Sequence, residues 1–385
     1  MRKILFIAII LIISCAGIFY LYDYTVNSSF FDKNASPTEK AVSSSVNSPS
    51  KKNIPTPIPT KVPTKAPQSK KDTITLSFAG DVLLDRNVAN VISQKGAKFI
   101  LSDVKPVLAA SDISMINLEC PISTRGTKAK DKQFTFRAKP SSVEALTSAG
   151  IDIVTLANNH ILDFGTDAML DTFTNLDKAG IKYVGAGYDL DKASMAKYYN
   201  LNGSNVAILG SSHVIPVVEW AAGKNSPGVA TTYNPARLLS EISNAKKKAD
   251  IVVVYLHWGT ERNTKPDTYQ RNLAKKYIDS GADLVIGSHP HVLQGFEYYK
   301  GKLIAYSLGN FVFTNIKNDT MILNVKFNRD KSYTASVSAC AIDNYRPVLL
   351  KDKPKQTALF NKLQQLSFGA RIDPNGIISP SAGIK

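Results

Sequence analysis

The sequence predicts an α/β protein whose buried sheets carry helices on both faces, preceded by a transmembrane helix and a disordered linker. From Asp72 onward, short apolar segments of strand length alternate with longer segments of helical periodicity. The strand segments are apolar on both faces, which is typical of sheets covered on both sides. The composition, 44% hydrophobic and 20% charged over 385 residues, excludes wholesale disorder, a collagen-like fibre and a polytopic membrane protein.

The first part of this body alternates strictly. Strands are expected at 73–79, 113–118, 151–157, 206–209, 251–257 and 284–286, and helices at 104–110, 141–149, 166–179, 235–248 and 268–280. Ser141 is a candidate N-cap, and Gly150 and Gly180 end two of the helices. Four later strands at 302–307, 310–314, 321–327 and 333–342 lack long helices between them and predict an antiparallel addition. After Arg346 we expect a covering helix and a loose end.

The N-terminus predicts a membrane anchor. Residues 4–22 are uncharged and follow Arg2 and Lys3, and a helix of this length spans about 28 Å, close to the thickness of the hydrocarbon core. The positive flank stays inside, so the body is expected on the outer face. A rival interpretation is a lipoprotein box at Ile12-Ile13-Ser14-Cys15, and a cleaved signal or a buried core helix is a weaker one. The anchor, the lipoprotein and the cleaved signal all place the body outside the cytoplasmic membrane, whereas a buried core helix does not.

Residues 25–72 predict a tether, because they hold seven prolines and no apolar periodicity. The expected organisation is therefore an anchor at 1–24, a linker rich in Pro, Ser, Thr and Lys at 25–72, a domain at 73–345 and a C-terminal extension at 346–385. Two cysteines fall in the body, Cys120 and Cys340, and are expected to be buried free thiols.

The net charge of +16 predicts an anionic partner, since residues 73–385 alone carry +10. A dense basic helix of the kind that reads DNA is not obvious, so nucleic acid is a weak option. Phosphate, a teichoic polymer and polyglutamate also suit this charge, which does not choose among them.

Polar residues gather at the carboxyl ends of the predicted strands, where ligands bind in open α/β sheets. All five histidines lie at such exits: His160, His213, His257, His289 and His291. A single histidine would be a satisfied buried side chain, but the whole set beside carboxylates and amides predicts metal binding or catalysis. Imidazole, carboxylate and amide ligands without thiolate suit Zn, Mn, Fe, Ni or Co. In an extended chain His289 and His291 would project to the same side, toward one centre, and a shared carboxylate could bridge two ions.

These motifs resemble a known family. The order Gly80-Asp81, Asn117-Leu118-Glu119, Asn159-His160, His257-Trp258-Gly259-Thr260-Glu261, Gly287-Ser288-His289-Pro290-His291 and Ser307-Leu308-Gly309-Asn310-Phe311 is similar to that of the CapA proteins of poly-γ-glutamate capsule synthesis. That family is itself similar to calcineurin-like metallophosphoesterases. The resemblance covers roughly 73–315 and implies a four-layer α-β-β-α sandwich of two mixed sheets, an N-terminal anchor and an extracytoplasmic body.

The resemblance also implies one or two divalent transition metal ions (Mn, Zn or Fe) and a catalytic histidine, His160, that protonates the leaving group or orients phosphate. The implied metal ligands are Asp81, Glu119, Asn159, His257, His289 and His291. Glu119 takes the place of the bridging acid. The phosphatase pattern has a histidine two residues after the first aspartate, but this chain has Leu83 there, which weakens the first metal's site.

Four further residues are candidates for substrate binding or for a missing carboxylate: Arg86, Asp163, His213 and Glu261. Each has a plain alternative, such as a surface ion pair for Arg86, an N-cap or turn for Asp163 and a solvated loop acid for Glu261. The short run Gly185-Ala186-Gly187 lacks the full glycine fingerprint of a phosphate loop and predicts a turn.

The expected function is that of a membrane-anchored extracytoplasmic protein in the synthesis, export or anchoring of an anionic capsule polymer, poly-γ-glutamate by resemblance. Metal-dependent hydrolysis is the expected chemistry, and membrane subunits of a capsule synthase are the implied partners. One alternative is a non-catalytic subunit that binds polymer in a degenerate cleft. A weaker alternative is a nucleotidase or nuclease at the cell surface.

Overall fold

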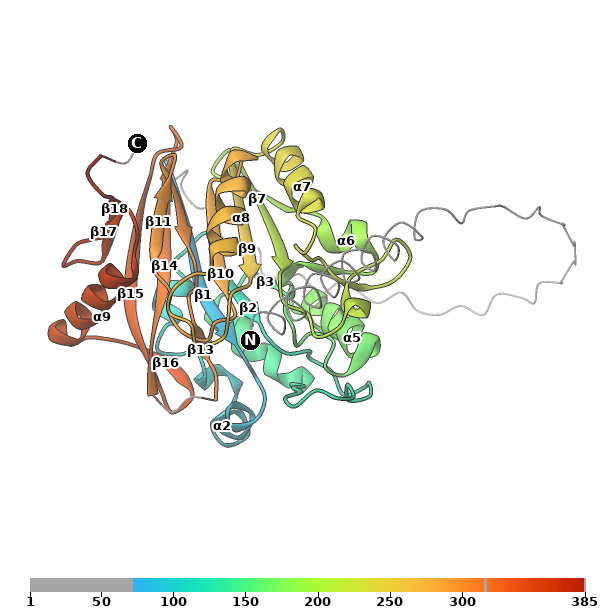
Figure 1. Cartoon of the computed structure of the whole chain (residues 1–385). Coiled ribbons are helices and arrows are strands. Elements are labelled where there is room, and N and C mark those ends of the chain that lie inside the picture. Colours follow the sequence, from blue (N-terminus) through green and yellow to red (C-terminus); the bar gives the residue numbers. More distant parts are fainter. Residues whose placement is uncertain (1–71, 315–316, 384–385) are drawn as a thin grey trace, which may run out of the picture. The chain divides into compact units, whose positions relative to one another are not determined.

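The computed structural model describes residues 72–314 and 317–383 (Figure 1). The expected anchor, the lipoprotein box at Cys15 and the proline-rich linker lie outside the described residues. Within the described part, no helix is long and apolar enough to cross a bilayer. The predicted α/β class is confirmed, and the described chain forms two main mixed sheets.

The larger sheet has ten strands, parallel in one half and antiparallel in the other, in the order β17-β18-β15-β14-β1-β2-β3-β4. Its strands are β1 (Thr73–Val82), β2 (Ile113–Leu118), β3 (Ile153–Thr155), β4 (Lys182–Val184), β13 (Asn310–Val312), β14 (Lys317–Asn328), β15 (Tyr333–Asp343), β16 (Arg346–Leu349), β17 (Ala370–Ile372) and β18 (Ile377–Pro380). The first four run parallel, β13 pairs with β1 and β16 pairs with β15.

The smaller sheet has six strands in the order β11-β12-β10-β9-β7-β6. Its strands are β6 (Lys197–Leu201), β7 (Ser204–Ser212), β9 (Ile251–His257), β10 (Leu284–Ser288), β11 (Phe296–Tyr299) and β12 (Lys302–Ala305). The central four are parallel, and every residue of β9 is buried, which explains its unbroken apolar sequence. Two short strands, β5 (Ala186–Gly187) and β8 (Gly228–Val229), pair separately.

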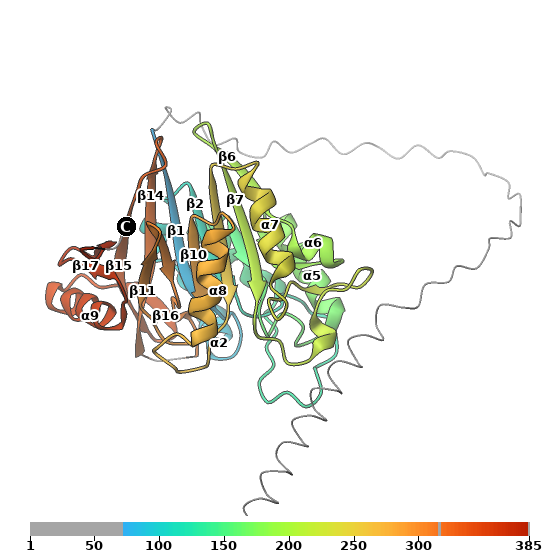
Figure 2. The same ribbon diagram turned by 45° about the horizontal axis from the view of Figure 1, so that its top comes forward.

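Helices alternate with the strands along the chain and cover the outer faces of the two sheets (Figures 1 and 2). Their bounds are α2 (Asn87–Lys95), α3 (Lys105–Leu108), α4 (Val143–Ala149), α5 (Gly165–Lys178), α6 (Leu190–Ser194), α7 (Ala236–Lys246), α8 (Thr268–Asp279) and α9 (Lys353–Leu366), with 3-10 turns at Ala97–Phe99, Pro140–Ser142 and Val218–Trp220. A capping box between Asp267 and Gln270 fixes the start of α8.

The two sheets pack face to face. Phe78 of β1 and Val253 and Tyr255 of β9 belong to one apolar core, and the Tyr255 hydroxyl donates to the Ala79 carbonyl at 2.8 Å. This bond joins the two sheets close to the carboxyl ends of β1 and β9. Alternate residues of β9, such as Val254, point to the opposite face and pack with Ile242 of α7.

A third core covers the outer face of the larger sheet. Ile116 of β2 and Val154 of β3 pack there with Leu146 of α4 and Phe173 of α5. Cys120 and Cys340 lie in this same core as free, buried thiols, as predicted. The packing places helices outside each sheet and leaves the ends of the strands open for a site.

Two predictions about these elements are wrong. Ser141 is not a cap: residues Pro140–Ser142 form a 3-10 turn, and α4 begins without a side-chain cap. The later strands are only partly antiparallel, because β12 pairs in parallel with β10 and β13 with β1. The reversal that makes this possible is the β11–β12 hairpin, whose turn residues Lys300 and Gly301 have φ of 49° and 69°.

The C-terminal segment contains the expected helix, α9, but not a loose end. β17 and β18 pair with each other, and β18 continues onto β15 of the larger sheet. The predicted turn at Gly185-Ala186-Gly187 is limited to Gly185, a bend with φ of 85°, because Ala186–Gly187 form β5. A Cβ atom on Gly187 would lie 2.3 Å from the Ala193 backbone nitrogen, so this glycine serves close packing.

Gly80 is a position where the fold requires the absence of a side chain. A Cβ atom there would lie 1.8 Å from the Gly309 carbonyl oxygen, because β1 passes β13 at this point. We expect Gly80→Ala to lower the free energy of unfolding by about 3 kcal/mol or more, as overpacking against backbone cannot relax by rotamer change. Gly180→Ala is the control: its space is open and only its φ of 73° is unfavourable, so about 1–2 kcal/mol is expected. Equal losses in denaturant unfolding of the two variants would contradict this account.

Candidate metal centre

The polar strand ends of the two sheets meet in one buried cluster. The larger sheet and its loops contribute Asp81, Glu119 and Asn159, which follow or end β1, β2 and β3. The smaller sheet contributes His257 at the end of β9, and His289 and His291 after β10. Each sheet therefore supplies half of the six ligands that the sequence pattern implies. This convergence follows from parallel strands whose carboxyl ends share an edge.

The segment after β10 is not extended, contrary to the expectation for His289 and His291. Both residues have positive φ, 98° and 59°, a conformation that costs energy in non-glycine residues. The two rings nevertheless lie on the same cluster, with their centroids 5.8 Å apart. The two rings therefore reach the cluster through a strained backbone that the surrounding fold stabilises, and not through the alternation of side chains along an extended strand.

One side of the cluster is built by two histidines and an amide. His257 Nε2 lies 3.0 Å from Asn159 Oδ1 and 3.0 Å from His289 Nδ1. Glu119 Oε1 is 3.8 Å from the same His257 nitrogen. An amide oxygen and two imidazole nitrogens therefore converge here, and these are ligand types that bind divalent transition metals.

The other side is built around Asp81. Its Oδ2 lies 3.4 Å from His291 Nδ1 and accepts a bond from the His289 backbone N–H at 3.3 Å. Glu119 Oε1 lies 3.9 Å from His291 Nε2, so this acid contacts both sides. His291 Nδ1 is also 2.8 Å from Asn310 Oδ1.

The residues present fit a divalent metal. Donor atoms of Glu119, His289 and His291 all lie within 4.8 Å of one another. Glu119 Oε1 is buried with no hydrogen-bond partner among the described residues, a cost that a cation would remove. Burial and the neighbouring Asp81 carboxylate raise the pKa of Glu119 well above its usual value. Burial, with the charge of His291, lowers the pKa of His289 to about 3, so His289 is a neutral ligand.

The position that would complete the Asp81 side is apolar. Leu83 is fully buried in the core beneath α2, α4 and α5, and its backbone N–H bonds the Val312 carbonyl. Asp81, Glu119 and His291 are therefore the three protein ligands available on this side. The His257 side has four: Glu119, Asn159, His257 and His289.

A histidine–aspartate pair borders the cluster. His160 Nδ1 lies 2.7 Å from Asp163 Oδ2, which also accepts a bond from the Phe136 backbone N–H at 2.7 Å. Asp163, a candidate carboxylate for which a turn or N-cap was the alternative, is fully buried in this pair. Burial lowers the pKa of His160 despite the opposing effect of Asp163.

Lys132 completes this arrangement, and sequence reasoning missed it. Its ammonium group donates to Asp163 Oδ1 and to the Asn159 carbonyl and lies 3.0 Å from His160 Nδ1. The Trp220 ring lies 5.1 Å from the same nitrogen. The residue stands in a lysine-rich loop that reads as solvated, so no local signal separates it from its neighbours.

Comparison with known proteins identifies one family. Residues 75–315 match the model described as bacterial capsule synthesis protein PGA_cap. The chain belongs to this family. This PGA_cap chain is 37% identical over 301 residues to the PGA biosynthesis protein CapA of Bacillus subtilis, covering 76% of this chain and 78% of that protein. It is 40% identical over 251 residues to the capsule biosynthesis protein CapA of Bacillus anthracis, and the match covers 63% of this chain and 61% of that protein.

Solved structures show weaker likeness. A hypothetical protein from Thermus thermophilus matches 69% of this PGA_cap chain and 99% of its own, with 15% identity and a TM-score of 0.42. The 5'-nucleotidase from Candida albicans matches 69% of this chain and 52% of its own, with 12% identity and a TM-score of 0.41.

Two asparagines support the ligands of this PGA_cap chain from behind. Asn117 Nδ2 donates to Asp81 Oδ1 at 2.8 Å and lies 3.2 Å from His257 Nδ1. Asn158 donates to Asn117 Oδ1 and the Leu118 carbonyl, while its own oxygen accepts the N–H groups of His160 and Ile161. Asn117 belongs to the Asn117-Leu118-Glu119 motif, but the spacing of residues in the sequence does not predict these hydrogen bonds.

Asn158 therefore carries four buried bonds, and its removal has a definite expected cost. We expect Asn158→Ala to lower the free energy of unfolding by about 2–4 kcal/mol, since each buried group left unpaired costs about 1–3 kcal/mol. Asn200→Ala is the control, because Asn200 is exposed and bonds only Asn205. Thermal or denaturant unfolding of both variants checks this, and a neutral Asn158→Ala would show that the network does not hold the site.

The remaining candidates lie around the cluster. Arg86 donates to the Thr135 carbonyl at 3.0 Å and covers Phe136, whose ring contacts His160. Glu261 lines a pocket of about 380 Å³ that also reaches His291 and Asn310. Neither residue belongs to the group of donor atoms that lie within 4.8 Å of one another.

His213 is the one histidine that stands apart from the ligands. Its Nδ1 lies 2.9 Å from Thr232 Oγ1, and its ring stacks on Tyr269 at 4.3 Å. Only its backbone touches the centre, through an N–H bond to the His257 carbonyl at 2.8 Å. The geometry thus gives His213 a packing role beside the centre of this PGA_cap chain.

Proposed function

We propose that this chain acts in the synthesis, export or anchoring of poly-γ-glutamate capsule, on the outer face of the membrane. Residues 1–24 anchor it there, 25–72 form the linker, and the domain at 73–345 with its extension at 346–385 carries the site. The relatives of Bacillus subtilis and Bacillus anthracis are named for PGA and capsule biosynthesis, which supports the pathway. Membrane subunits of a capsule synthase are the expected partners, and the +10 body suits an anionic polymer.

The chemistry we propose is metal-dependent hydrolysis of a phosphoester or a related acyl bond, in a four-layer fold of the metallophosphoesterase type. The observation that carries it is the buried cluster of histidines, carboxylates and an amide beside His160. Bound Mn, Zn or Fe would supply an activated water and charge stabilisation of the oxyanion. Glu119, Asn159, His257 and His289 would hold one ion, and Asp81, Glu119 and His291 a second.

The residues of the chain would do the remaining work. The oxygen of water would form the new bond to the phosphorus or carbonyl carbon while the bond to the leaving atom breaks. His160 Nε2 would take up a proton from this water and pass it to the leaving atom. Asp163 accepts from His160 Nδ1 and keeps the ring in the orientation that presents Nε2 to the leaving group. Arg86 and Glu261 border the space where the substrate would lie.

Complementation in cells that make the polymer tests this proposal. The full chain replaces the host's own family member, and the amount and length of released polymer are measured for wild type, His160→Ala and His257→Ala. Loss of normal polymer with His160→Ala, at normal protein level and metal content, is expected. Unchanged polymer with both variants would refute the hydrolytic proposal.

A second candidate function is a non-catalytic subunit that binds polymer in the same cleft. The observation that favours it is Leu83, whose buried aliphatic side chain leaves the Asp81 side with three ligands. Equilibrium binding of polymer to wild type and His160→Ala distinguishes the two. Equal binding, normal capsule with His160→Ala, and no turnover would establish the binding subunit.

A further inference from the structure

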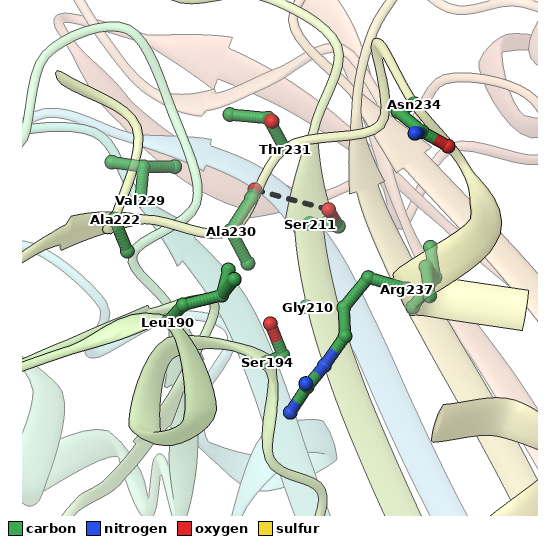
Figure 3. Close-up of a pocket in the computed structure, with 11 residues that line it drawn as sticks. Leu190, Ser194, Gly210, Ser211, Ala222, Val229, Ala230, Thr231, Asn234 and Arg237 are labelled. Carbon is green, nitrogen blue, oxygen red and sulfur yellow. Dashed lines mark hydrogen bonds between the residues drawn. The ribbon is translucent and has the colours of Figure 1, made fainter. Parts of the chain in front are cut away.

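A hollow that is partly open to solvent lies beside β7 of the smaller sheet, and none of the six candidate metal ligands lines it (Figure 3). Its volume is about 280 Å³, below the range of drug-sized sites but sufficient for a ligand of a few heavy atoms. The floor is the carboxyl end of β7 at Gly210 and Ser211, and α6 and the start of α7 form its sides.

The walls divide into an apolar half and a polar half. Leu190, Leu238 and Val229 line one part, together with Ala222 and Ala230. The other part carries hydroxyl, amide and guanidinium groups, from Ser194, Ser211, Thr231, Asn234 and Arg237. No acidic side chain lines the hollow. Such a lining suits a small molecule with an aliphatic body and one anionic or acyl end.

Donor groups gather on the polar part. Arg237 Nε is buried with no hydrogen-bond partner among the described residues, which costs free energy unless a ligand oxygen meets it. The side chains of Ser194 and Thr231 line the same part of the hollow. In Figure 3 the Arg237 side chain runs beside Ser194, while the Ser211 hydroxyl is already committed to the Ala230 carbonyl at 3.0 Å.

The first turn of α7 adds to these donors. α7 has 11 residues and begins at Ala236, so the backbone N–H groups of Arg237 and Leu238 have no acceptor within the helix. Both residues line the hollow. The positive end of the helix and the guanidinium therefore act on the same space, and both favour a negatively charged oxygen.

The partners of Arg237 restrict the charge of the ligand. The guanidinium is paired through Nη2 with Asp191 at 2.8 Å and Glu241 at 3.0 Å. Asp191 is 81% exposed, so its pairing is worth little and leaves the guanidinium able to bind another oxygen. Two nearby acids would still repel a dianion. A monocarboxylate is therefore favoured over inorganic phosphate.

We propose that this hollow is a second ligand site that binds a short aliphatic carboxylate, with the carboxylate on Arg237, Ser194 and the first turn of α7, and the aliphatic body on Leu190, Val229 and Leu238. The site goes beyond the capsule function and does not depend on it. It lies on the face of β7 opposite the metal centre: Ser211 lines the hollow, whereas its neighbour Ser212 pairs with His257.

Methyl NMR of the full chain in detergent, titrated with butyrate, tests the site. Butyramide has the same size without the charge, and inorganic phosphate supplies charge without the aliphatic body. We expect saturable shifts at the methyls of Leu190, Val229 and Leu238 with butyrate, and at least tenfold weaker binding of butyramide and phosphate. Absence of saturable shifts, or equal binding of butyramide, would overturn the proposal.

Variants locate the ligand. Arg237→Gln is expected to weaken butyrate at least tenfold, and Ser194→Leu to abolish binding by filling the hollow. Asp191→Asn removes an exposed partner of Arg237 without touching the lining, so binding should be unchanged or tighter. His289→Ala should leave butyrate binding intact, and this separates the result from the fate of the metal proposal. Loss of butyrate binding in His289→Ala, with Arg237→Gln unaffected, would assign the ligand to the metal centre and refute the second site.

Discussion

Replacing His289 with alanine is expected to strip the metal from this protein. His289 Nδ1 lies 3.0 Å from His257 Nε2, and its donor atom belongs with those of Glu119 and His291 to the group within 4.8 Å. Loss of an outer partner of a ligand typically costs about 10–100-fold in metal affinity, so loss of a ligand itself should cost more. Elemental mass spectrometry of the purified full chain after exposure to Mn, Zn or Fe measures this directly.

His213→Ala is the matched control for that experiment. It removes the same side chain from the same edge of the sheet, but His213 bonds Thr232 and stacks on Tyr269 instead of facing the cluster. Its metal content should equal that of wild type. Metal retained in His289→Ala, or lost equally in both variants, would contradict the site as we describe it. About two ions per chain in wild type would indicate that the Asp81 side fills despite Leu83.

Lys132→Met is expected to leave metal content nearly intact while it removes turnover and lowers stability. The Lys132 ammonium bonds both Asp163 and the Asn159 carbonyl. Removing one partner of a buried ion pair costs about 3–5 kcal/mol. The Lys132 side chain keeps 14% of its exposure, and Phe136 still donates to Asp163, so we expect the lower end, about 3 kcal/mol.

Three measurements on Lys132→Met separate positioning from plain destabilisation. These are denaturant unfolding, metal content, and hydrolysis of a generic phosphodiester well below the unfolding transition, where kcat should fall and KM should change little. Lys132→Arg keeps the charge and should recover part of kcat. Lys130→Met, an exposed neighbour in the same loop, should change none of the three. Wild-type kcat in Lys132→Met would show that the His160–Asp163 pair needs no lysine.

The sequence predicted the site best where chemistry sits at strand ends. Asp81, Glu119, Asn159 and His257 could be placed because parallel strands bring their carboxyl ends to one edge. Lys132 could not, because its role depends on how a long loop folds back over Asn159. His213 follows a strand that ends at the same edge, but its side chain contacts Thr232 and not the cluster, which the spacing of the sequence does not predict.

The fold was predicted least well where pairing is decided by distant contacts. The β11–β12 hairpin depends on a turn at Lys300 and Gly301, and this turn converts an expected antiparallel strand into a parallel neighbour of β10. β17 and β18, which follow α9, are short, and most residues of β18 are exposed. Their position is determined by pairing of β18 with the edge of β15 and not by the periodicity of their own sequence. Local signals were sufficient for α5, α7 and α8, where amphipathic spacing and end residues agree.

The equal division of the ligands between the two sheets has a consequence for how the protein responds to its surroundings. An ion bound by Asn159 of one sheet and His257 of the other would link the two sheets. Binding to the folded state alone adds stability that grows with free metal, about 4 kcal/mol at 1,000 times the dissociation constant. In the extracytoplasmic location that we propose, no cytoplasmic buffering fixes that concentration. The amount of folded protein at the surface would then depend on the metal concentration of the medium. Metal starvation would lower the number of folded molecules before it lowered the activity of each folded molecule.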